Sequence, residues 1–420
     1  MNRTWRKDKY IDFSPPDISE LEIREVEEVL RSGWITTGPR TKKFEKKLAE
    51  YIGVNQVVCL NSATAAEELI LRIAGIGQGD EVIVPAYTYT STAAAAIHVG
   101  AKVVFVDSQA NSTEMDYDAV EKVINKHTKA IIPVDLGGTL CDYKRIFDLV
   151  KGQRGKFVPE GATELGRKIQ SAIGRVMVIA DCAHALGARR KIDNVWQMAG
   201  NIADFSSFSF HAVKNFTTAE GGAAVWREIP GIESEEIYHF FQLYSLHGQS
   251  KDALTKSQSG MWEYDILGPW YKCNMTDIMA GIGLKQLERY PELLERRKKI
   301  IGRYDEACDR MEIEHMAHFT NDMISSGHLY ITRIPGASDM ARRKMIARMA
   351  ERGVICNVHY KPLPLMSGYK ALGADEKAYP NAVKLYENEI SLPLHTRLTD
   401  EDVEYVIEQF ENVVKEYREN

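Results

Sequence analysis

The sequence predicts an α/β fold: a large, mainly parallel sheet with helices on both faces, followed by a smaller α+β domain. Three observations predict this arrangement. Short apolar runs alternate with helical patterns through the first half of the chain, which is typical of parallel sheets buried on both faces. A long helical pattern then runs from about Met275 to Cys308, and the residues beyond it mix helix and strand. A chain of 420 residues is also too long for one simple core, so we expect two domains, residues 1–275 and 276–420.

Two helical patterns come first, and strands follow. Ser19 and Glu22 form a capping-box pattern ahead of a stripe of apolar residues, which predicts that a helix begins near Ser19. Residues 33–39, with the sequence GWITTGP, break this helix, and a second one is expected from about Thr41. Another helix is expected from Ala65 to Ala74. The expected strands are Gln56 to Leu60, Glu81 to Val84, Lys102 to Val106, Ala130 to Val134, Val176 to Ala180 and Phe205 to Phe208.

Two stretches interrupt this alternation. Residues 151–174 are polar and basic and are interpreted as an inserted excursion between a helix and a strand. Residues 248–271 are rich in Gly, Ser and Trp and have no periodicity. The sequence GIGQG at 75–79 superficially suggests a dinucleotide-binding loop, but it follows a helix and precedes a strand, which is the reverse of the context that this motif requires. It is interpreted as the turn that ends a helix.

Composition argues against several classes of function. Lys and Arg number 53 against 59 Asp and Glu, a formal net charge of −6, so no nucleic-acid partner is expected. The six cysteines are scattered and form no C-x-x-C pair, so neither a disulfide framework nor a metal site is predicted. Residues 1–12 lack the apolar core of a signal peptide, and no apolar stretch approaches the roughly 20 residues of a membrane span. A reducing cytoplasm is the expected location.

The loop at residues 61–66 follows a predicted buried strand and opens a helix. Its small residues, NSATAA, let backbone N–H groups approach an anion, and the helix dipole favours a phosphate at this position. An ordinary Ser or Thr helix cap explains the same residues. The loop alone therefore predicts either a cap or a phosphate site.

Asp181 directly follows the apolar run that ends at Ala180. Ligands collect at the carboxyl ends of parallel strands. A carboxylate there can sit against a pyridine nitrogen and keep it protonated, as the electron sink of pyridoxal chemistry requires. A helix N-cap is the alternative role. His184, one turn further on, is placed to hydrogen-bond a ring hydroxyl, although a histidine at the edge of the core would give the same pattern.

Lys214 follows another strand-like run, in the sequence SFHAVK that starts at Ser209. A lysine among apolar and hydroxyl residues is unusual, because partial desolvation there lowers its pKa and frees the amine to attack a carbonyl. Ser209 offers a hydroxyl to a phosphate. Tyr89 stands just past a further strand end, where an aromatic ring either stacks on a cofactor or belongs to the core.

Taken together, these blocks resemble the DegT/StrS-type aminotransferases, the pyridoxal-phosphate family that aminates nucleotide-linked keto-sugars. The similarity extends from about Ser14 to Asn412, and the blocks occur in the family's order and spacing. They are SGWITTGP at 32–39, the loop at 61–66, residues 85–92, DCAH at 181–184, residues 209–222, YKCNMTD at 271–277, VHY at 358–360 and SLPLH at 391–395. The resemblance implies the aspartate-aminotransferase fold, which is fold type I of the pyridoxal-phosphate enzymes.

Carried over by position, the resemblance implies that Lys214 binds pyridoxal 5'-phosphate covalently and that Asp181 pairs with its pyridine nitrogen. These two are the implied catalytic residues. Further contacts are implied to the phosphate, from Ala63, Thr64 and Ser209, to the ring oxygen, from His184, and to the ring face, from Tyr89.

The resemblance also implies a homodimer with shared active sites, in which residues 272–274 reach the phosphate of the neighbouring subunit. The commoner family sequence there is Tyr-Asn-Tyr-Arg, whereas this chain has YKCN, so both Lys272 and Asn274 are candidates for the contact. The implied substrates are an amino-acid donor, L-glutamate, and a nucleotide-linked keto-sugar as acceptor. Trp34, Thr36 and His359 are implied to lie near the sugar.

Two features depart from the family pattern. Residues 135–142 read DLGGTLCD where many relatives carry His-Leu-Tyr-Gly, and the excursion at 151–174 is longer than usual. Two other functions stay open: a pyridoxal-dependent sugar dehydratase, whose relatives carry histidine in place of Lys214, and a non-catalytic regulatory protein that binds cofactor and sugar. The intact set of Lys214, Asp181 and Ser209 favours the aminotransferase.

Overall fold

The structure, a computed structural model, describes residues 10–251 and 263–419. Its largest element is a seven-stranded sheet with the strand order β1-β9-β8-β5-β4-β2-β3. The strands are β1 (Val57–Leu60), β2 (Glu81–Pro85), β3 (Lys102–Val106), β4 (Thr128–Ile131), β5 (Met177–Asp181), β8 (Phe205–Ser209) and β9 (Gly222–Trp226). Neighbouring strands are parallel except at β9, which is antiparallel to both β1 and β8. The predicted, mainly parallel sheet is therefore confirmed, and each strand expected from the sequence occurs in it.

Side chains of the sheet alternate between two apolar cores, one on each face. Ile83 and Val178 point into one core, and their neighbours Val82 and Met177 point into the other. The first face is covered by α2 (Pro39–Ile52), α5 (Tyr117–Val123), α6 (Tyr143–Gly152) and the N-terminal part of α10 (Asp277–Arg310). The second face is covered by α3 (Ala63–Ile73), α4 (Thr90–His98), α7 (Glu164–Ile173) and α8 (Ser234–Ser245).

The polar segment at 151–174 ends in a regular helix that covers the sheet. Leu165 and Ile169 of α7 are buried in the second core, while the neighbouring Arg167 and Lys168 are exposed. Gly166 packs on the turn at Gly75, and a Cβ atom at Gly166 would lie 2.5 Å from the Gly75 Cα. The GIGQG sequence therefore ends α3 in a turn, as expected, and this turn receives α7.

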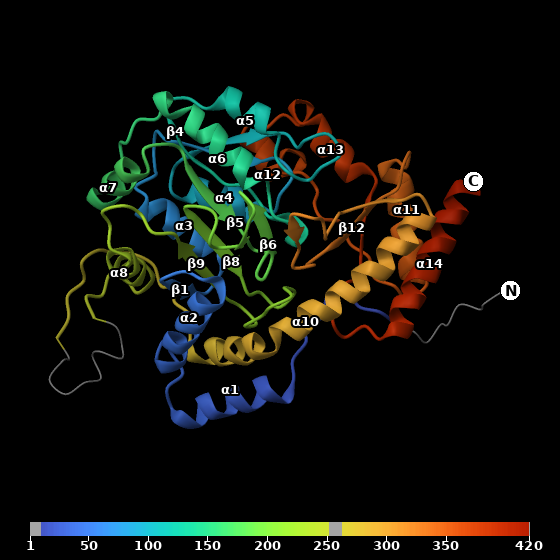
Figure 1. The fold of residues 1–420 in the computed structure, drawn as a ribbon, viewed down its shortest axis with the longest axis horizontal. Helices are drawn as coiled ribbons and strands as arrows, with labels where there is room; N and C mark the ends of the chain where they lie inside the picture. Colours follow the sequence, from blue (N-terminus) through green and yellow to red (C-terminus); the bar gives the residue numbers. More distant parts are fainter. Residues whose placement is uncertain (1–9, 252–262, 420) are drawn as a thin grey trace.

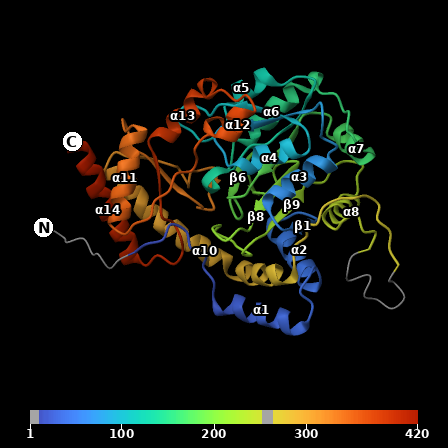
Figure 2. The same ribbon diagram turned by 180° about the vertical axis from the view of Figure 1, so that it is seen from behind.

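A second, smaller core lies beyond the sheet. It is formed by an antiparallel three-stranded sheet of β10 (Glu314–His315), β12 (Tyr330–Arg333) and β13 (Glu389–Leu392), together with α11 (Asp339–Glu351), α14 (Asp400–Glu419) and the C-terminal half of α10. Figures 1 and 2 show α10 running from under the large sheet to this core. Ile11 is buried in the same core and pairs with Val354, so the N-terminal segment returns to the C-terminal part of the chain. The predicted domain boundary at residues 275/276 stays a prediction.

The remaining elements surround these two cores. They are α1 (Glu20–Ser32), α12 (Ser367–Ala371) and α13 (Pro380–Glu387). The capping box of α1 is confirmed: the Ser19 hydroxyl accepts from the first turn, and the Glu22 carboxylate accepts from the Ser19 N–H at 2.7 Å. Within residues 10–251 and 263–419, no helix is long and apolar enough to cross a bilayer.

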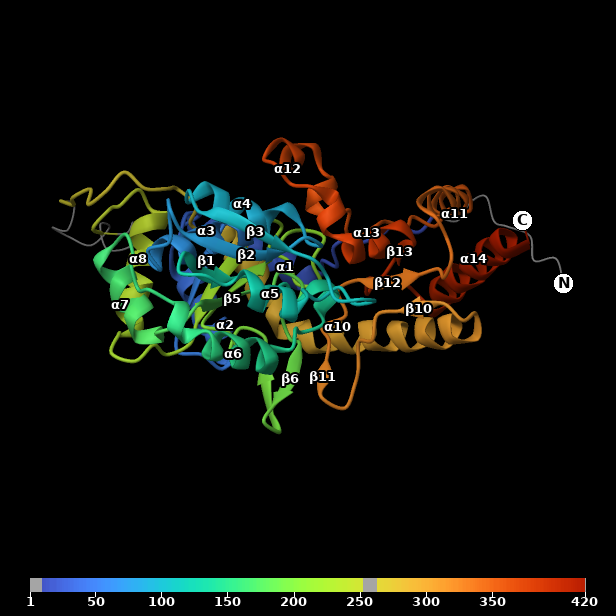
Figure 3. The same cartoon turned by 90° about the horizontal axis from the view of Figure 1, so that it is seen from above.

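A further small sheet, which the sequence did not predict, projects from the body of the molecule (Figure 3). It consists of the hairpin β6 (Arg189–Ile192) and β7 (Val195–Met198), joined by the short strand β11 (Met323–Ile324). The hairpin turns through Asp193 and Asn194, whose φ angles are 50° and 65°. Asp and Asn tolerate this left-handed conformation, which favours tight two-residue hairpins.

Candidate active site

The carboxyl ends of β5 and β8 open into a cavity of about 580 Å³. Parallel strands end at the same edge of their sheet, so residues distant in sequence meet here. Most of the predicted cofactor residues line it. The predicted residues among its walls are Ala63, Thr64, Tyr89, Asp181, His184, Ser209, Lys214 and His359.

The loop before α3 forms one wall of the cavity. Ser62 caps the helix, because its hydroxyl accepts from the Ala65 N–H at 3.1 Å. The loop also faces the cavity. The helix cap expected from the sequence is therefore present, and a phosphate site in the same loop stays a prediction. Thr64 contacts the Ser91 hydroxyl at 2.9 Å. Gly222 of β9 passes directly behind the loop, and a Cβ atom there would lie 2.3 Å from the Ser62 carbonyl carbon. Only glycine permits this close packing of β9 against the loop before α3.

Asp181, the last residue of β5, is 4% exposed and firmly held. One carboxylate oxygen accepts from the Thr92 hydroxyl at 2.8 Å, and the other accepts from the Ala183 N–H at 3.1 Å. Of the predicted capping role, the described residues show only the hydrogen bond that Asp181 accepts from the Ala183 N–H. A buried carboxylate fixed by two donors is suited to facing a cationic partner.

Lys214 lies across the cavity on the loop after β8 and is half-buried. Burial lowers the pKa of its amine to about 8, against the opposing effect of the Asp181 charge. The loop is tied down on both sides of the lysine. Ser14 donates to the Val213 carbonyl at 2.9 Å, and the Asn215 amide donates to the Ser326 carbonyl at 3.1 Å. The amine is thus positioned and is partly neutral at ordinary pH.

His184 is buried behind Asp181, and its tautomer follows from its contacts. Its Nδ1 accepts from the Gly137 N–H at 3.1 Å, so in the neutral ring the proton is on Nε2, which lies 3.3 Å from the Tyr360 hydroxyl. Burial, with the nearby Lys214 charge, holds its pKa well below the ordinary value. Segment 135–142, which departs from the family sequence, therefore supplies the Gly137 N–H that fixes the orientation of the His184 ring.

The remaining predicted residues divide into two groups. Tyr89 and Ser209 line the cavity, and the Tyr89 ring is 5.8 Å from that of Tyr360. His359 also lines it, and its Nδ1 is 2.9 Å from the Ser391 hydroxyl. The second group is not among the lining residues: Trp34, Thr36, Lys272 and Asn274.

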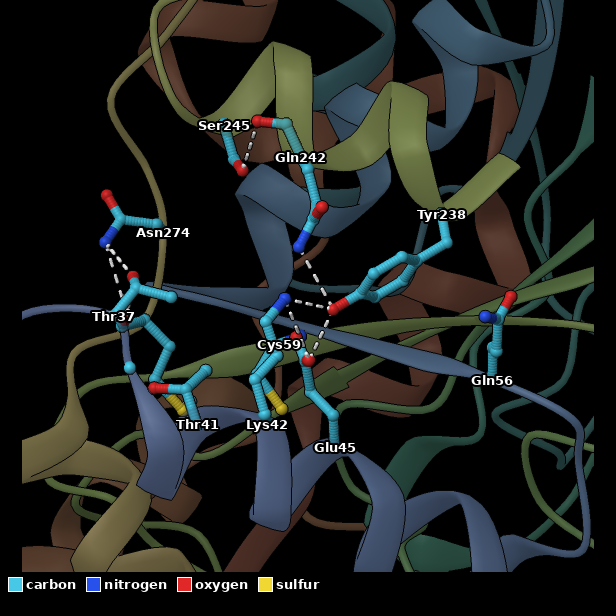
Figure 4. A network of polar contacts seen from close by, with 12 residues as sticks. Thr37, Thr41, Lys42, Glu45, Gln56, Cys59, Tyr238, Gln242, Ser245 and Asn274 are labelled. Atoms are coloured by element: carbon cyan, nitrogen blue, oxygen red, sulfur yellow. Dashed lines mark hydrogen bonds and ion pairs between the residues drawn. The ribbon is translucent and has the colours of Figure 1, made fainter. Parts of the chain in front are cut away.

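This second group lies together at the start of α10. The Lys272 amine contacts the side-chain oxygen of Asn274. The Asn274 side-chain amide donates to the Thr37 hydroxyl (Figure 4). The Trp34 ring donates to the Thr37 carbonyl at 3.1 Å, and the Thr36 carbonyl accepts from the Asp277 N–H at 3.1 Å. The structure thus brings together the two sequence blocks around Trp34 and Asn274. Asn274 pairs with Leu60, directly before the loop at 61–66, but neither block is among the cavity-lining residues.

Three polar groups around the site were missed by the sequence analysis. Glu67 is fully buried beside Asp181, Tyr360 lines the cavity, and the His328 ring is tilted against that of His184 with 4.2 Å between ring centroids. Glu67 had a detectable signal, because it falls on the apolar face of its predicted helix. In the described part of the chain, no group of three or more metal-ligating side chains is arranged to hold a metal ion.

Comparison with known proteins identifies the family. The model of the DegT/DnrJ/EryC1/StrS aminotransferase family matches residues 16–174 and 167–411, which together cover nearly the whole chain. The chain belongs to this family. The predicted resemblance is therefore confirmed, and the protein is an aminotransferase of the DegT family.

Individual DegT-family relatives cover the chain almost completely. A putative sugar aminotransferase from Streptococcus pneumoniae, Spr1654, solved in its PMP form, is 53% identical with a TM-score of 0.92, over 98% of this chain and 99% of that one. The spore coat polysaccharide biosynthesis protein SpsC of Bacillus subtilis is 35% identical over 98% of each chain. The UDP-4-amino-4-deoxy-L-arabinose–oxoglutarate aminotransferase of Shewanella sediminis is 32% identical over 97% of this chain and 98% of its own. The likeness to the pneumococcal structure confirms fold type I.

DegT-family aminotransferases use pyridoxal 5'-phosphate, and the pneumococcal relative has been solved in a PLP form. The residues of this chain fit that cofactor. An amine of lowered pKa, a fixed buried carboxylate and the N-terminus of a helix surround one cavity. They match the aldehyde, the ring nitrogen and the phosphate of the cofactor respectively.

Proposed function

We propose that this enzyme transfers an amino group from L-glutamate to a nucleotide-linked keto-sugar, in two half-reactions on pyridoxal 5'-phosphate. The observation that carries the proposal is the meeting of Lys214, Asp181 and the N-terminus of α3 at one cavity. Lysine rather than histidine at position 214 argues against the dehydratase alternative. The same complete set of groups argues against a purely regulatory protein.

The roles assigned to the chain follow from its chemistry. When bound, pyridoxal 5'-phosphate supplies an aldehyde that takes the amino group and a pyridine ring that accepts electrons. Lys214 would hold the cofactor, and its amine, when free, would take the proton from the α-carbon of the donor. Asp181 keeps the ring nitrogen protonated. Ala63, Thr64 and Ser209 hold the phosphate, with Tyr89 on the ring face and His184 near the ring oxygen.

The substrate class is supported by the relatives and by the shape of the site. The Shewanella relative's name gives a UDP-linked sugar and oxoglutarate, the keto acid left when glutamate gives up its amino group. Spr1654 is named a putative sugar aminotransferase. In this chain the cavity extends beyond the residues assigned to the cofactor and reaches Asn357 and His359. We assign this end to the sugar, together with Trp34 and Thr36.

The free cysteines of the described residues fit a reducing cytoplasm as the location of the enzyme.

A half-reaction tests the acceptor class. The enzyme is first loaded with pyridoxamine phosphate and then mixed with single nucleotide-linked keto-sugars. We expect the absorbance of the pyridoxal form to return with such a sugar. Free α-keto acids other than 2-oxoglutarate and simple aldehydes serve as controls and should react much more slowly. If only these simple carbonyl compounds restore the pyridoxal form, the proposed acceptor class is wrong.

We also propose a homodimer whose active sites are shared. Among the described residues that line the cavity, Lys214 is the only lysine or arginine, so in this part of the chain the phosphate end has neutral donors and no cation of its own. Lys272 and Asn274 have suitable donors but lie outside that lining. Ile23 and Leu30 lie on the same face of α1 and are 52% and 54% exposed. An apolar helix face of this kind is typical of a subunit interface, and a two-fold axis would let each chain lend residues 272–274 to the other.

Mixed dimers test this sharing. One chain carries Lys214→Ala, and the other carries Lys272→Ala with Asn274→Ala. Each homodimer should be nearly inactive, whereas a mixed dimer contains one site with both Lys214 and the intact segment 272–274. Subunit exchange should therefore restore up to about half of the parent activity per mixed dimer. No recovery, with exchange verified by differently tagged chains, would show that each site is built from a single chain.

A further inference from the structure

Glu67 is a buried carboxyl that the proposed function does not use. It lies on the first turns of α3, is 0% exposed and does not line the cavity. One oxygen accepts from the Ser207 hydroxyl of β8 at 2.9 Å, and the other accepts from the Ser91 hydroxyl of α4 at 3.1 Å. Its carboxyl lies close to that of Asp181, which is the sheet partner of the same Ser207.

When two carboxyl groups lie close together inside a protein, ionising both is strongly unfavourable, so one of them holds a proton. Burial raises the pKa of Glu67 well above its ordinary value, and the Asp181 charge adds to this effect. Asp181 has the better environment for the charge, since it accepts from the Thr92 hydroxyl and the Ala183 N–H and faces the Lys214 amine. The shared proton therefore belongs to Glu67, which is then a hydrogen-bond donor.

The contacts of Glu67 join the two ends of the site. Ser91, which donates to Glu67, also contacts the Thr64 hydroxyl of the loop before α3 at 2.9 Å. A chain of hydrogen bonds therefore runs from Thr64 at the cavity wall through Ser91 to Glu67, whose buried carboxyl lies beside that of Asp181. Buried networks with every member satisfied fix the positions of their groups.

We propose that Glu67, as a neutral carboxylic acid, donates a hydrogen bond to Asp181 and so positions that carboxylate against the pyridine nitrogen of the cofactor. This inference rests on the proposed role of Asp181. Glu67 is a positioning residue, because it acts through Asp181 and touches neither cofactor nor substrate. An ionised or absent Glu67 would leave Asp181 with a repelling neighbour or without one of its donors.

Two variants separate the donor from the mere filling of space. Glu67→Gln keeps a neutral donor of similar size, and Ser91 can reverse its hydrogen bond because it also contacts Thr64. Glu67→Leu removes the donor. The measurements are the dissociation constant of pyridoxal 5'-phosphate from the apo enzyme and the absorbance of the bound cofactor across pH. Glu67→Gln should bind the cofactor within about threefold of the parent, and Glu67→Leu should bind it about tenfold or more weakly and shift the absorbance titration.

Matched controls and a direct readout complete the test. Glu45→Gln alters another buried glutamate, which accepts from the Cys59 N–H at 2.9 Å and from Tyr238 at 2.7 Å, and should leave both measurements unchanged (Figure 4). Infrared difference spectra between the parent and Glu67→Gln should contain the carbonyl band of a protonated carboxylic acid at neutral pH. This readout does not depend on whether Glu67→Leu folds.

Each outcome decides the question. The inference is overturned if the infrared band is that of an ionised carboxylate, if Glu67→Gln is as defective as Glu67→Leu, or if both bind and absorb like the parent. Asp181→Asn is run alongside. If Asp181→Asn changes the absorbance while both Glu67 variants behave like the parent, only the role of Glu67 falls. If Asp181→Asn also changes nothing, the proposed function of Asp181 falls as well.

Discussion

Replacing Lys214 by alanine is expected to abolish covalent attachment of the cofactor and to lower turnover by about 10³-fold or more. The Lys214 amine is assigned both the attachment of the cofactor and the proton transfer, so one substitution removes both functions. Borohydride reduction followed by peptide mass spectrometry should place the cofactor on Lys214 in the parent protein and on no residue in the variant. Amino transfer from glutamate gives the change in turnover.

The control for this substitution is Lys144→Ala, which removes an exposed lysine paired with Asp148 and should change neither measurement. A Lys214→Ala protein that transfers amino groups at the parent rate would contradict the assignment.

The pH dependence of cofactor uptake gives a further check on Lys214. Because burial lowers the pKa of Lys214 to about 8, the neutral amine becomes more abundant as pH rises. Cofactor uptake by the apo enzyme should therefore accelerate up to about pH 8 and level off above it.

The sheet could be predicted from sequence because its strands are short, apolar and separated by helices. Val82 and Ile83 face opposite cores, so both must be apolar, and such continuous apolar runs are typical of strands covered on both faces. The positions of Asp181 and Lys214 followed from the same pattern, since each comes at or just after the end of a predicted strand. Parallel topology then requires that these ends meet.

Other features could not be predicted because their signals are not local. Helix α7 was not predicted because its outer face is polar; Leu165 and Ile169 are buried in the core, and Ile173 packs against it. The hairpin β6–β7 has a mixed, partly exposed pattern, and its Asp193-Asn194 turn was the one available signal. The contacts of Glu67 come from two other elements, β8 and α4, so its role depends on tertiary structure.

Asp181→Asn is expected to lower turnover on the order of 10³-fold while the fold is kept. An asparagine fits the same space, and its carbonyl oxygen still accepts from the Ala183 N–H. Its neutral amide, however, cannot stabilise a protonated pyridine nitrogen, so the ring loses its capacity to accept electrons. Both half-reactions should slow together, because both require the electron sink. Stopped-flow absorbance of each half-reaction measures this directly.

The matched control for Asp181→Asn is Asp135→Asn, another buried aspartate near the same edge of the sheet. Asp135 accepts from the Cys141 N–H and the Tyr143 hydroxyl and does not line the cavity. Burial raises its pKa to about 7, so an amide there should cost some stability and leave the cofactor absorbance unchanged. Removing the Asp181 charge should instead lower the pKa of Lys214 further, because that charge stabilises the protonated amine. Cofactor uptake by the Asp181→Asn apo enzyme should then level off below pH 8. Near-parent turnover in Asp181→Asn with cofactor bound, together with an unchanged uptake profile, would show that this carboxylate is only structural.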